Sequence, residues 1–142
     1  GHESWISNMV ETGKAVQMII CALDTDRPLG SVYIRDIDRQ HHKAEYGIFI
    51  GEGQARGRGL GTAAAKLMLR YCFREAGLHR VYLRALADNA QAIRSYEKAG
   101  FVREGYLRDD VRIEGEYRDI VWMAALGPGE GQDGRQEVCG TG

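Results

Sequence analysis

Long apolar runs and an excess of charge of one sign are both missing from this 142-residue sequence. No apolar run approaches the roughly 20 residues that cross a membrane as a helix. The 19 basic and 20 acidic side chains leave a formal net charge of -1, which gives no support to nucleic acid or a membrane surface as the main partner. Any polyanion that the protein binds must therefore be held by a local cluster of charges.

Cysteine is also scarce, with Cys21, Cys72 and Cys139 widely spaced and no C-x-x-C pair. An odd number of separated cysteines predicts neither a zinc site nor a disulfide framework. No other cluster has metal-ligand spacing, so we expect no metal. We expect two core thiols and one tail thiol, in a reducing compartment such as the cytoplasm.

The start of the chain shows no signal peptide, and Gly1-His2 without methionine is typical of a remnant of an expression tag. We therefore expect the natural N-terminus to lie upstream. The length and the 44% hydrophobic and 27% charged content predict one globular domain, over residues 3–126. Residues 127–142 hold six glycines and no aromatic residue, and we expect a disordered tail there.

The first half of the chain predicts strands. Residues 3–13 are expected to form a short helix, and three β-branched apolar segments follow at 16–23, 29–37 and 44–50. Their connections are too short for helical crossovers, so they predict an antiparallel meander.

The second half alternates between helix and strand. Apolar spacing predicts a helix over 62–76, then a strand over 79–87, and a helix that Asn89 can cap and Gly100 ends. Two strands, 101–112 and 117–126, are expected to form a hairpin. The fold class is α+β, with a strand–helix–strand unit in the middle.

The segment from Gln54 to Thr62 (QARGRGLGT) lies between a strand and a helix. Glycines let backbone N–H groups approach a ligand, and the helix start adds unpaired donors and positive dipole charge. Arg56 and Arg58 can fork onto phosphate oxygens. This combination predicts a phosphate or pyrophosphate site. The alternative is a connector that needs no ligand.

Three nucleotide or nucleic-acid readings fit this loop less well. The P-loop pattern is absent, because Lys66 lies inside the helix. Residues 59–64 satisfy G-x-G-x-x-A, but three antiparallel strands come first, which is not the order of a dinucleotide-binding fold. One Arg-Gly-Arg-Gly copy is a weak RNA-binding signal.

The loop resembles a known family better. Arg56-x-x-Gly59-x-Gly61 resembles the Q/R-x-x-G-x-G/A loop of the GNAT superfamily, the acyl-CoA-dependent N-acetyltransferases. Residues 89–101 are similar to the family's second signature, N-x-x-A-x-x-x-Y-x-K-x-G-F. Residues 106–123 are similar to the ending of the branch that includes ribosomal-protein and spermidine acetyltransferases. The similarity runs from about residue 16 to 126.

The resemblance implies a GNAT-type fold, a central twisted, mostly antiparallel sheet with flanking helices. Family members usually begin with a strand and a helix that help form the acceptor pocket, and these elements would precede residue 3 here. A natural short form, a truncation, or a wall supplied by a neighbouring copy in a homodimer would each account for this.

The resemblance also assigns the cofactor side, for which acetyl-CoA is the implied co-substrate. Pantetheine would lie along Ile48, Phe49 and Ile50 and bond the backbone there. The pyrophosphate would sit on the loop and helix start. Asn89 and Tyr96, on one face of a helix, would be further contacts, although Asn89 could serve as a helix cap alone. The implied loop contacts are Arg56, Gly57, Arg58, Gly59, Leu60, Gly61 and Thr62.

Two catalytic residues follow from the resemblance. Tyr96 takes the family position of the general acid for the leaving thiolate; the alternative is a core aromatic. Glu45 lies where some members place a general base, and a carboxylate near an apolar wall can have a raised pKa. The alternative for Glu45 is a structural or solvent-facing role.

We therefore expect an N-acetyltransferase that moves an acetyl group from acetyl-CoA to a primary amine by direct transfer, with no nucleic-acid or membrane partner. A non-catalytic acyl-CoA-binding module is the alternative, and a nicotinamide enzyme is a third. The acceptor stays open between a protein N-terminus, a polyamine, an amino sugar and an aminoglycoside. Five carboxylates could attract a cationic acceptor, although a solvated surface explains them equally well: Asp36, Asp38, Asp109, Asp110 and Glu114.

Overall fold

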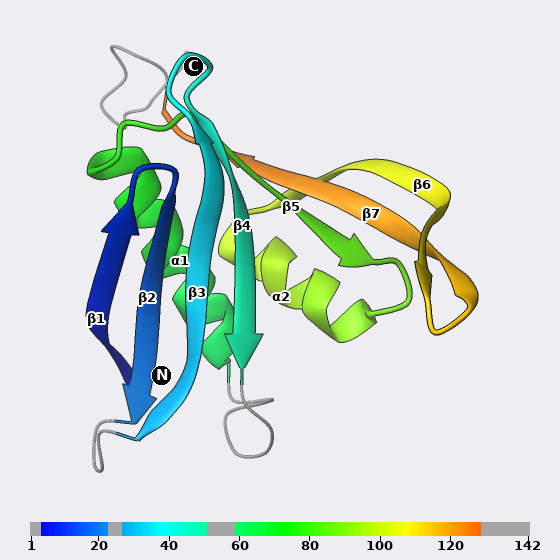
Figure 1. Ribbon diagram of the computed structural model, residues 1–142, viewed down its shortest axis with the longest axis horizontal. Helices are drawn as coiled ribbons and strands as arrows, with labels where there is room; N and C mark the ends of the chain where they lie inside the picture. Colours follow the sequence, from blue (N-terminus) through cyan, green and yellow to red (C-terminus); the bar gives the residue numbers. More distant parts are fainter. Residues whose placement is uncertain (1–3, 23–26, 51–58, 129–142) are drawn as a thin grey trace.

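The computed structural model describes residues 4–22, 27–50 and 59–128, which form one seven-stranded sheet with two helices (Figure 1). The strands lie in the order β1-β2-β3-β4-β5-β7-β6. Their order along the chain is β1 (Ser4–Thr12), β2 (Ala15–Ala22), β3 (Pro28–Asp38), β4 (Lys43–Ile50), α1 (Leu60–Arg74), β5 (Arg80–Leu86), α2 (Ala90–Ala99), β6 (Val102–Ile113) and β7 (Glu116–Leu126). Neighbouring strands are antiparallel except for β4 and β5.

The helix expected over residues 3–13 is wrong, because this segment is strand β1 at the edge of the sheet. It pairs with β2 from Ser4↔Ala22 to Thr12↔Ala15. Only two residues, Gly13 and Lys14, separate the strands, which favours a hairpin. A helix this short is marginal in water, whereas a strand pairs with β2 along nearly its whole length, with one irregularity between Ile6 and Asn8.

The remaining predicted elements are confirmed, with ends that move by a few residues. The β2–β3–β4 meander, the β4–α1–β5 unit and the β6–β7 hairpin all form. The hairpin turns at Glu114 and Gly115, whose φ angles of 52° and 81° are both left-handed. Such a turn matches the twist of the strands that it joins.

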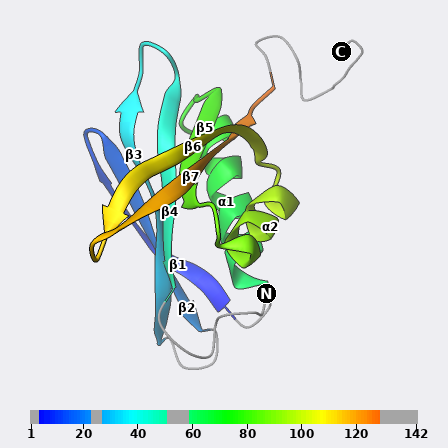
Figure 2. The same ribbon diagram turned by 90° about the vertical axis from the view of Figure 1, so that its right-hand side faces the viewer.

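Both helices cover the same face of the sheet (Figure 2). The side chains between them and the sheet form one apolar core, with Ile34, Met68 and Met123 fully buried. Cys21 and Cys72 are buried and are not joined in a disulfide, and Cys139 lies outside the described residues. No helix in the described ranges is long and apolar enough to cross a membrane.

Strands β4 and β5 are paired over a short stretch only and then diverge. Their ladder has three rungs, from Lys43↔Arg80 to Glu45↔Tyr82. Beyond it, β4 stays with β3 as far as Ile50, while β5 stays with β7 as far as Leu86. The two halves of the sheet therefore diverge from this point (Figure 1).

The first residue of the expected tail belongs to the domain. The Gly127 N–H donates to the His79 carbonyl at 2.7 Å. A Cβ at Gly127 would lie 2.7 Å from the Phe73 ring, so the backbone approaches that ring closely. Residues 129–142 lie outside the described residues, and the disordered tail stays a prediction for them.

Two truncations test where the domain ends. Removing residues 129–142 should leave Tm nearly unchanged, because a Gly-rich polar segment has few contacts to lose. Removing residues 127–142 also breaks the Gly127 bond, worth about 1 kcal/mol, and should lower Tm by about 4 °C. Calorimetry of the two truncated proteins and the parent protein measures these changes in Tm. An equally large drop with the shorter deletion would mean that the tail packs on the domain.

Candidate active site

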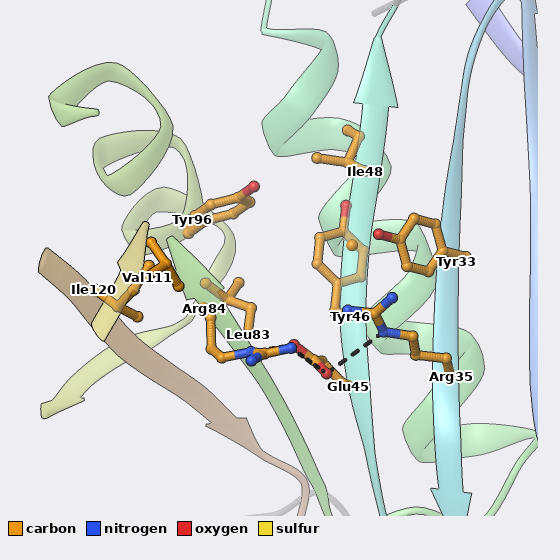
Figure 3. Close-up of a pocket in the computed structure, with 11 residues that line it drawn as sticks. Tyr33, Arg35, Glu45, Tyr46, Ile48, Leu83, Arg84, Tyr96, Val111 and Ile120 are labelled. Carbon is orange, nitrogen blue, oxygen red and sulfur yellow. Dashed lines mark hydrogen bonds and ion pairs between the residues drawn. The ribbon is translucent and has the colours of Figure 1, made fainter. Parts of the chain in front are cut away.

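A pocket of about 360 Å³ lies where β4 and β5 diverge (Figure 3). Strands β3, β4, β5, β6 and β7 and helix α2 all contribute to its walls. The described residues that line it are Tyr33, Arg35, Glu45, Tyr46, Gly47, Ile48, Leu83, Arg84, Tyr96, Val111 and Ile120.

The edge of β4 presents backbone groups to this opening. The Arg80 N–H donates to the carbonyl of His42, the residue just before β4. Backbone groups alternate in direction along a strand, so the even-numbered residues of β4 also turn their N–H and C=O groups toward β5. Beyond the last rung, Ile48 and Ile50 therefore direct these groups toward the opening. Phe49 bonds toward β3 instead, and its side chain is largely exposed.

Tyr96 reaches the opening from α2. Its hydroxyl points toward β4 (Figure 3), and its ring packs edge-on against Tyr46 and Phe101, with centroids 6.2 and 5.9 Å away. Burial raises the pKa of Tyr96, and nearby Tyr33 raises it further. The hydroxyl therefore keeps its proton at neutral pH, as a general acid must.

Tyr46 is a site residue that the sequence analysis missed. It is 3% exposed, and its hydroxyl has no hydrogen-bond partner among the described residues. Burial raises the pKa of Tyr46 far above its usual value. A buried polar group without a partner is costly and calls for an explanation. The two-residue alternation with Ile48 along β4 was a signal that could have identified it.

Glu45 stands at the last rung of the β4/β5 ladder, and its surroundings are ionic rather than apolar. It is 6% exposed. Arg84 of β5 takes both of its oxygens, with Nε–Oε2 at 2.8 Å and Nη2–Oε1 at 3.3 Å. Arg35 of β3 places Nε 3.5 Å from Oε1. One carboxylate thus joins three strands where the sheet divides, and its hydrogen bond raises the pKa of Arg84.

The start of α1 is the described part of the segment for which the sequence predicts a phosphate site. Gly59 caps the helix with a left-handed φ of 75° and no side-chain hydrogen bond, and no acidic residue occupies the first turn. Leu60 is buried, which fixes the helix start in the core. Its first N–H groups have no partner inside the helix, as at any helix start. Arg56, Gly57 and Arg58 lie outside the described residues.

Two residues that are predicted as loop contacts, Thr62 and Gly61, lie where helix α1 approaches helix α2. The Thr62 hydroxyl lies 3.1 Å from the Ser95 hydroxyl, which links α1 to α2. A Cβ at Gly61 would lie 3.1 Å from that same Ser95 oxygen, so glycine allows the helices to approach. Asn89 caps α2, because its side chain accepts a hydrogen bond from Ala92 N–H at 3.2 Å. The cap that the sequence predicts is therefore present, and a cofactor contact by Asn89 stays a prediction.

Similar proteins are acetyltransferases by name. In Escherichia coli K12, spermidine N(1)-acetyltransferase is 38% identical over 94 residues, which are 66% of this chain and 50% of that protein. The L-amino acid N-acetyltransferase AaaT of the same strain is 29% identical over 86% of this chain and 75% of its own length. The solved spermidine N-acetyltransferase from Vibrio cholerae, in complex with CoA and spermine, superposes with a TM-score of 0.75 and 29% identity, over 80% of this chain and 66% of that one.

The chain thus spans about half the length of the spermidine relative that it matches in Escherichia coli. The acetyltransferase (GNAT) domain model matches residues 1–102, which include β4, the glycine-rich segment, α1 and Tyr96. Together with the divided sheet and the order of its elements, this match places the chain in the GNAT acetyltransferase domain family.

Proposed function

We propose that the protein transfers an acetyl group from acetyl-CoA to a primary amine, directly and without a covalent intermediate. The observation that carries the proposal is the opening between β4 and β5, where a strand edge with no partner in the described part of the chain faces the hydroxyl of Tyr96. An extended amide-bearing chain such as pantetheine can add to a free strand edge through main-chain hydrogen bonds. The Vibrio cholerae structure with CoA bound has the same fold.

The residues present fit such a substrate. Ile48 and Ile50 offer backbone groups to the pantetheine amides, and Tyr46, whose buried hydroxyl has no partner among the described residues, lines the same pocket. The start of α1, which no side chain caps, supplies N–H donors and positive dipole charge for the pyrophosphate, to which Arg56 and Arg58 would add charge. Gly57, Gly59, Gly61, Thr62 and Asn89 are proposed as further contacts on this side.

Arg58→Ala tests the phosphate site. Loss of one charge-assisted hydrogen bond should weaken CoA binding roughly tenfold to a hundredfold, and CoA should raise Tm less than in the parent protein. Arg70→Ala is the control, because Arg70 is an exposed residue of α1 outside the loop. Identical melting shifts for the parent and Arg58→Ala across CoA concentrations would refute the loop assignment.

The chemistry needs a neutral amine, an oriented thioester and a proton for the thiolate. The amine nitrogen attacks the carbonyl carbon, and a backbone N–H of β4 can stabilise the oxyanion that develops. The carbon–sulfur bond then breaks. Tyr96 donates its proton to the leaving thiolate and is reprotonated by solvent. Its raised pKa keeps the hydroxyl protonated until that step.

Tyr96→Phe should lower kcat by roughly a hundredfold, at the low end of general acid catalysis because a thiolate is a fair leaving group. The dissociation constant of acetyl-CoA should change little, since the ring and its packing on Phe101 remain. Tyr117→Phe, at an exposed position near the hairpin turn, is the control. An unchanged kcat would refute the acid role, and a large loss of CoA affinity with kcat preserved would make Tyr96 a binding residue.

Glu45 is proposed as the base, acting through a water molecule. Both oxygens of Glu45 already have guanidinium partners, two contacts from Arg84 and one from Arg35. The proposed water bridges the amine and this cluster: it takes the proton from the amine nitrogen and passes a proton on to Glu45. The same carboxylate also ties β3, β4 and β5 together, so its structural and chemical contributions must be separated by experiment.

Glu45→Gln and Arg84→Gln separate the two roles, because both weaken the ionic cluster and only the first removes the base. Glu45→Gln should lower kcat/KM by roughly 10²-fold or more, because the base is lost. Arg84→Gln should lower kcat/KM much less, because the carboxylate of Glu45 remains. Equal losses of kcat/KM in the two variants would show that Glu45 is structural.

One measurement distinguishes the alternative, a non-catalytic acyl-CoA-binding module, from a transferase. A transferase releases CoA thiol when it is mixed with acetyl-CoA and a library of amines, and a binding module does not. The names of the similar proteins favour catalysis. A homodimer remains a proposal for the acceptor side, and cytoplasmic location rests on the cysteine pattern alone.

A further inference from the structure

The charged side chains that line the pocket are two arginines and one glutamate: Arg35, Arg84 and Glu45. No lysine, aspartate or histidine joins them among the described residues that form its walls. Glu45 is committed to Arg84, which bonds both carboxylate oxygens. The pocket therefore carries one guanidinium in excess of its carboxylates.

Arg35 is the excess cation. Its one contact with Glu45 is long, at 3.5 Å, and its side chain is 49% exposed. The guanidinium lies 5.7 Å from the centre of the Tyr33 ring. Figure 3 shows its terminal nitrogens turned away from Glu45, toward the Tyr33 and Tyr46 side of the pocket. These nitrogens form a planar fork that suits a carboxylate.

Two more carboxylates lie nearby, and neither lines the pocket. Asp110 acts electrostatically on Arg84, and Asp36 acts on Tyr82. Both are exposed, so water screens their charge. The carboxylates that could have attracted a cationic acceptor thus stand outside the pocket, and the excess positive charge stands inside it.

We propose that the acceptor is an apolar α-amino acid, whose carboxylate binds Arg35 while its amine meets the thioester. The proposal rests on the acetyltransferase function proposed above. A polyamine would bring further positive charge beside two guanidiniums, which costs free energy. Leu83, Val111 and Ile120 supply an apolar wall for the acceptor's side chain.

Among the described residues, the two helices leave one face of the sheet uncovered, and this face is the proposed approach for the acceptor. The helices cover the other face of the sheet (Figure 2), and Tyr96, a residue of helix α2, lines the pocket. Arg35 and Arg84 are partly exposed, unlike the core residues on the helix side. An amino acid can therefore reach the ionic cluster from the open face, while the CoA substrate occupies the β4 edge and the helix side.

The test compares L-leucine, L-leucinamide and spermidine as acceptors for the whole chain, by release of CoA thiol. Leucinamide lacks only the carboxylate, and its amine loses a proton more readily, so intrinsic reactivity favours the amide. A preference for leucine must then come from the protein. We expect kcat/KM for leucine to exceed that for leucinamide by roughly tenfold to a hundredfold, the worth of one charge-assisted hydrogen bond.

Arg35→Gln should bring this ratio close to one, and Arg35→Lys should keep part of it. Arg70→Gln, on the surface of α1, should keep the full ratio. A CoA-induced rise in Tm checks that each variant is folded with its cofactor side intact.

Three results would overturn the proposal. Faster turnover of leucinamide or spermidine by the parent protein would refute the acceptor class while leaving the transferase function standing. A leucine preference that survives Arg35→Gln would refute the role of Arg35. No thiol release with any amine, or no CoA binding, would refute the transferase function and this inference with it.

Discussion

The early end of the β4/β5 ladder is the constraint on which the rest of the molecule depends. Three rungs hold the two halves of the sheet together, and each strand then follows a different neighbour. An interior strand normally has both edges paired. Among the described residues, β4 beyond Glu45 keeps one edge unpaired, beside the buried Tyr46 and the hydroxyl of Tyr96. The pocket lies at that edge, and the proposed function uses the edge to bind an extended ligand.

The ionic cluster of Glu45, Arg84 and Arg35 lies where β4 and β5 diverge, and it influences both the shape and the charge of the pocket there. Glu45 is buried, and its oxygens contact Arg84 from β5 and Arg35 from β3. A buried carboxylate needs such partners, because an unpaired buried charge is very costly. Two arginines for one glutamate also leave the pocket with surplus positive charge. The same three side chains thus join β3, β4 and β5 where the strands diverge and set the charge of the pocket, on which the proposed choice of acceptor rests.

Local patterns in the sequence were enough for most elements, because apolar spacing, the Asn89 cap and the Glu114-Gly115 turn all act over a few residues. The helix predicted for residues 3–13 is wrong, because a strand at the edge of a sheet depends on pairing with its neighbour, here β2, more than on its own sequence pattern. The Glu45 environment could not be derived, since Arg84 lies 39 positions away and meets it only through the sheet. Tyr96 was identified by its helix signature, whereas Tyr46 needed the strand alternation to be followed one residue further.

Hydrogen exchange of the Ile48 amide tests the central claim most directly, because that N–H should face the opening without a strand partner. Residue-resolved NMR can measure it with and without saturating CoA, using the Gly47 amide, which bonds toward β3, as the internal reference. The account predicts that CoA slows exchange at Ile48 by at least about tenfold, as a new hydrogen bond forms, while Gly47 changes little. Unchanged exchange at Ile48 in a protein that demonstrably binds CoA would contradict the account.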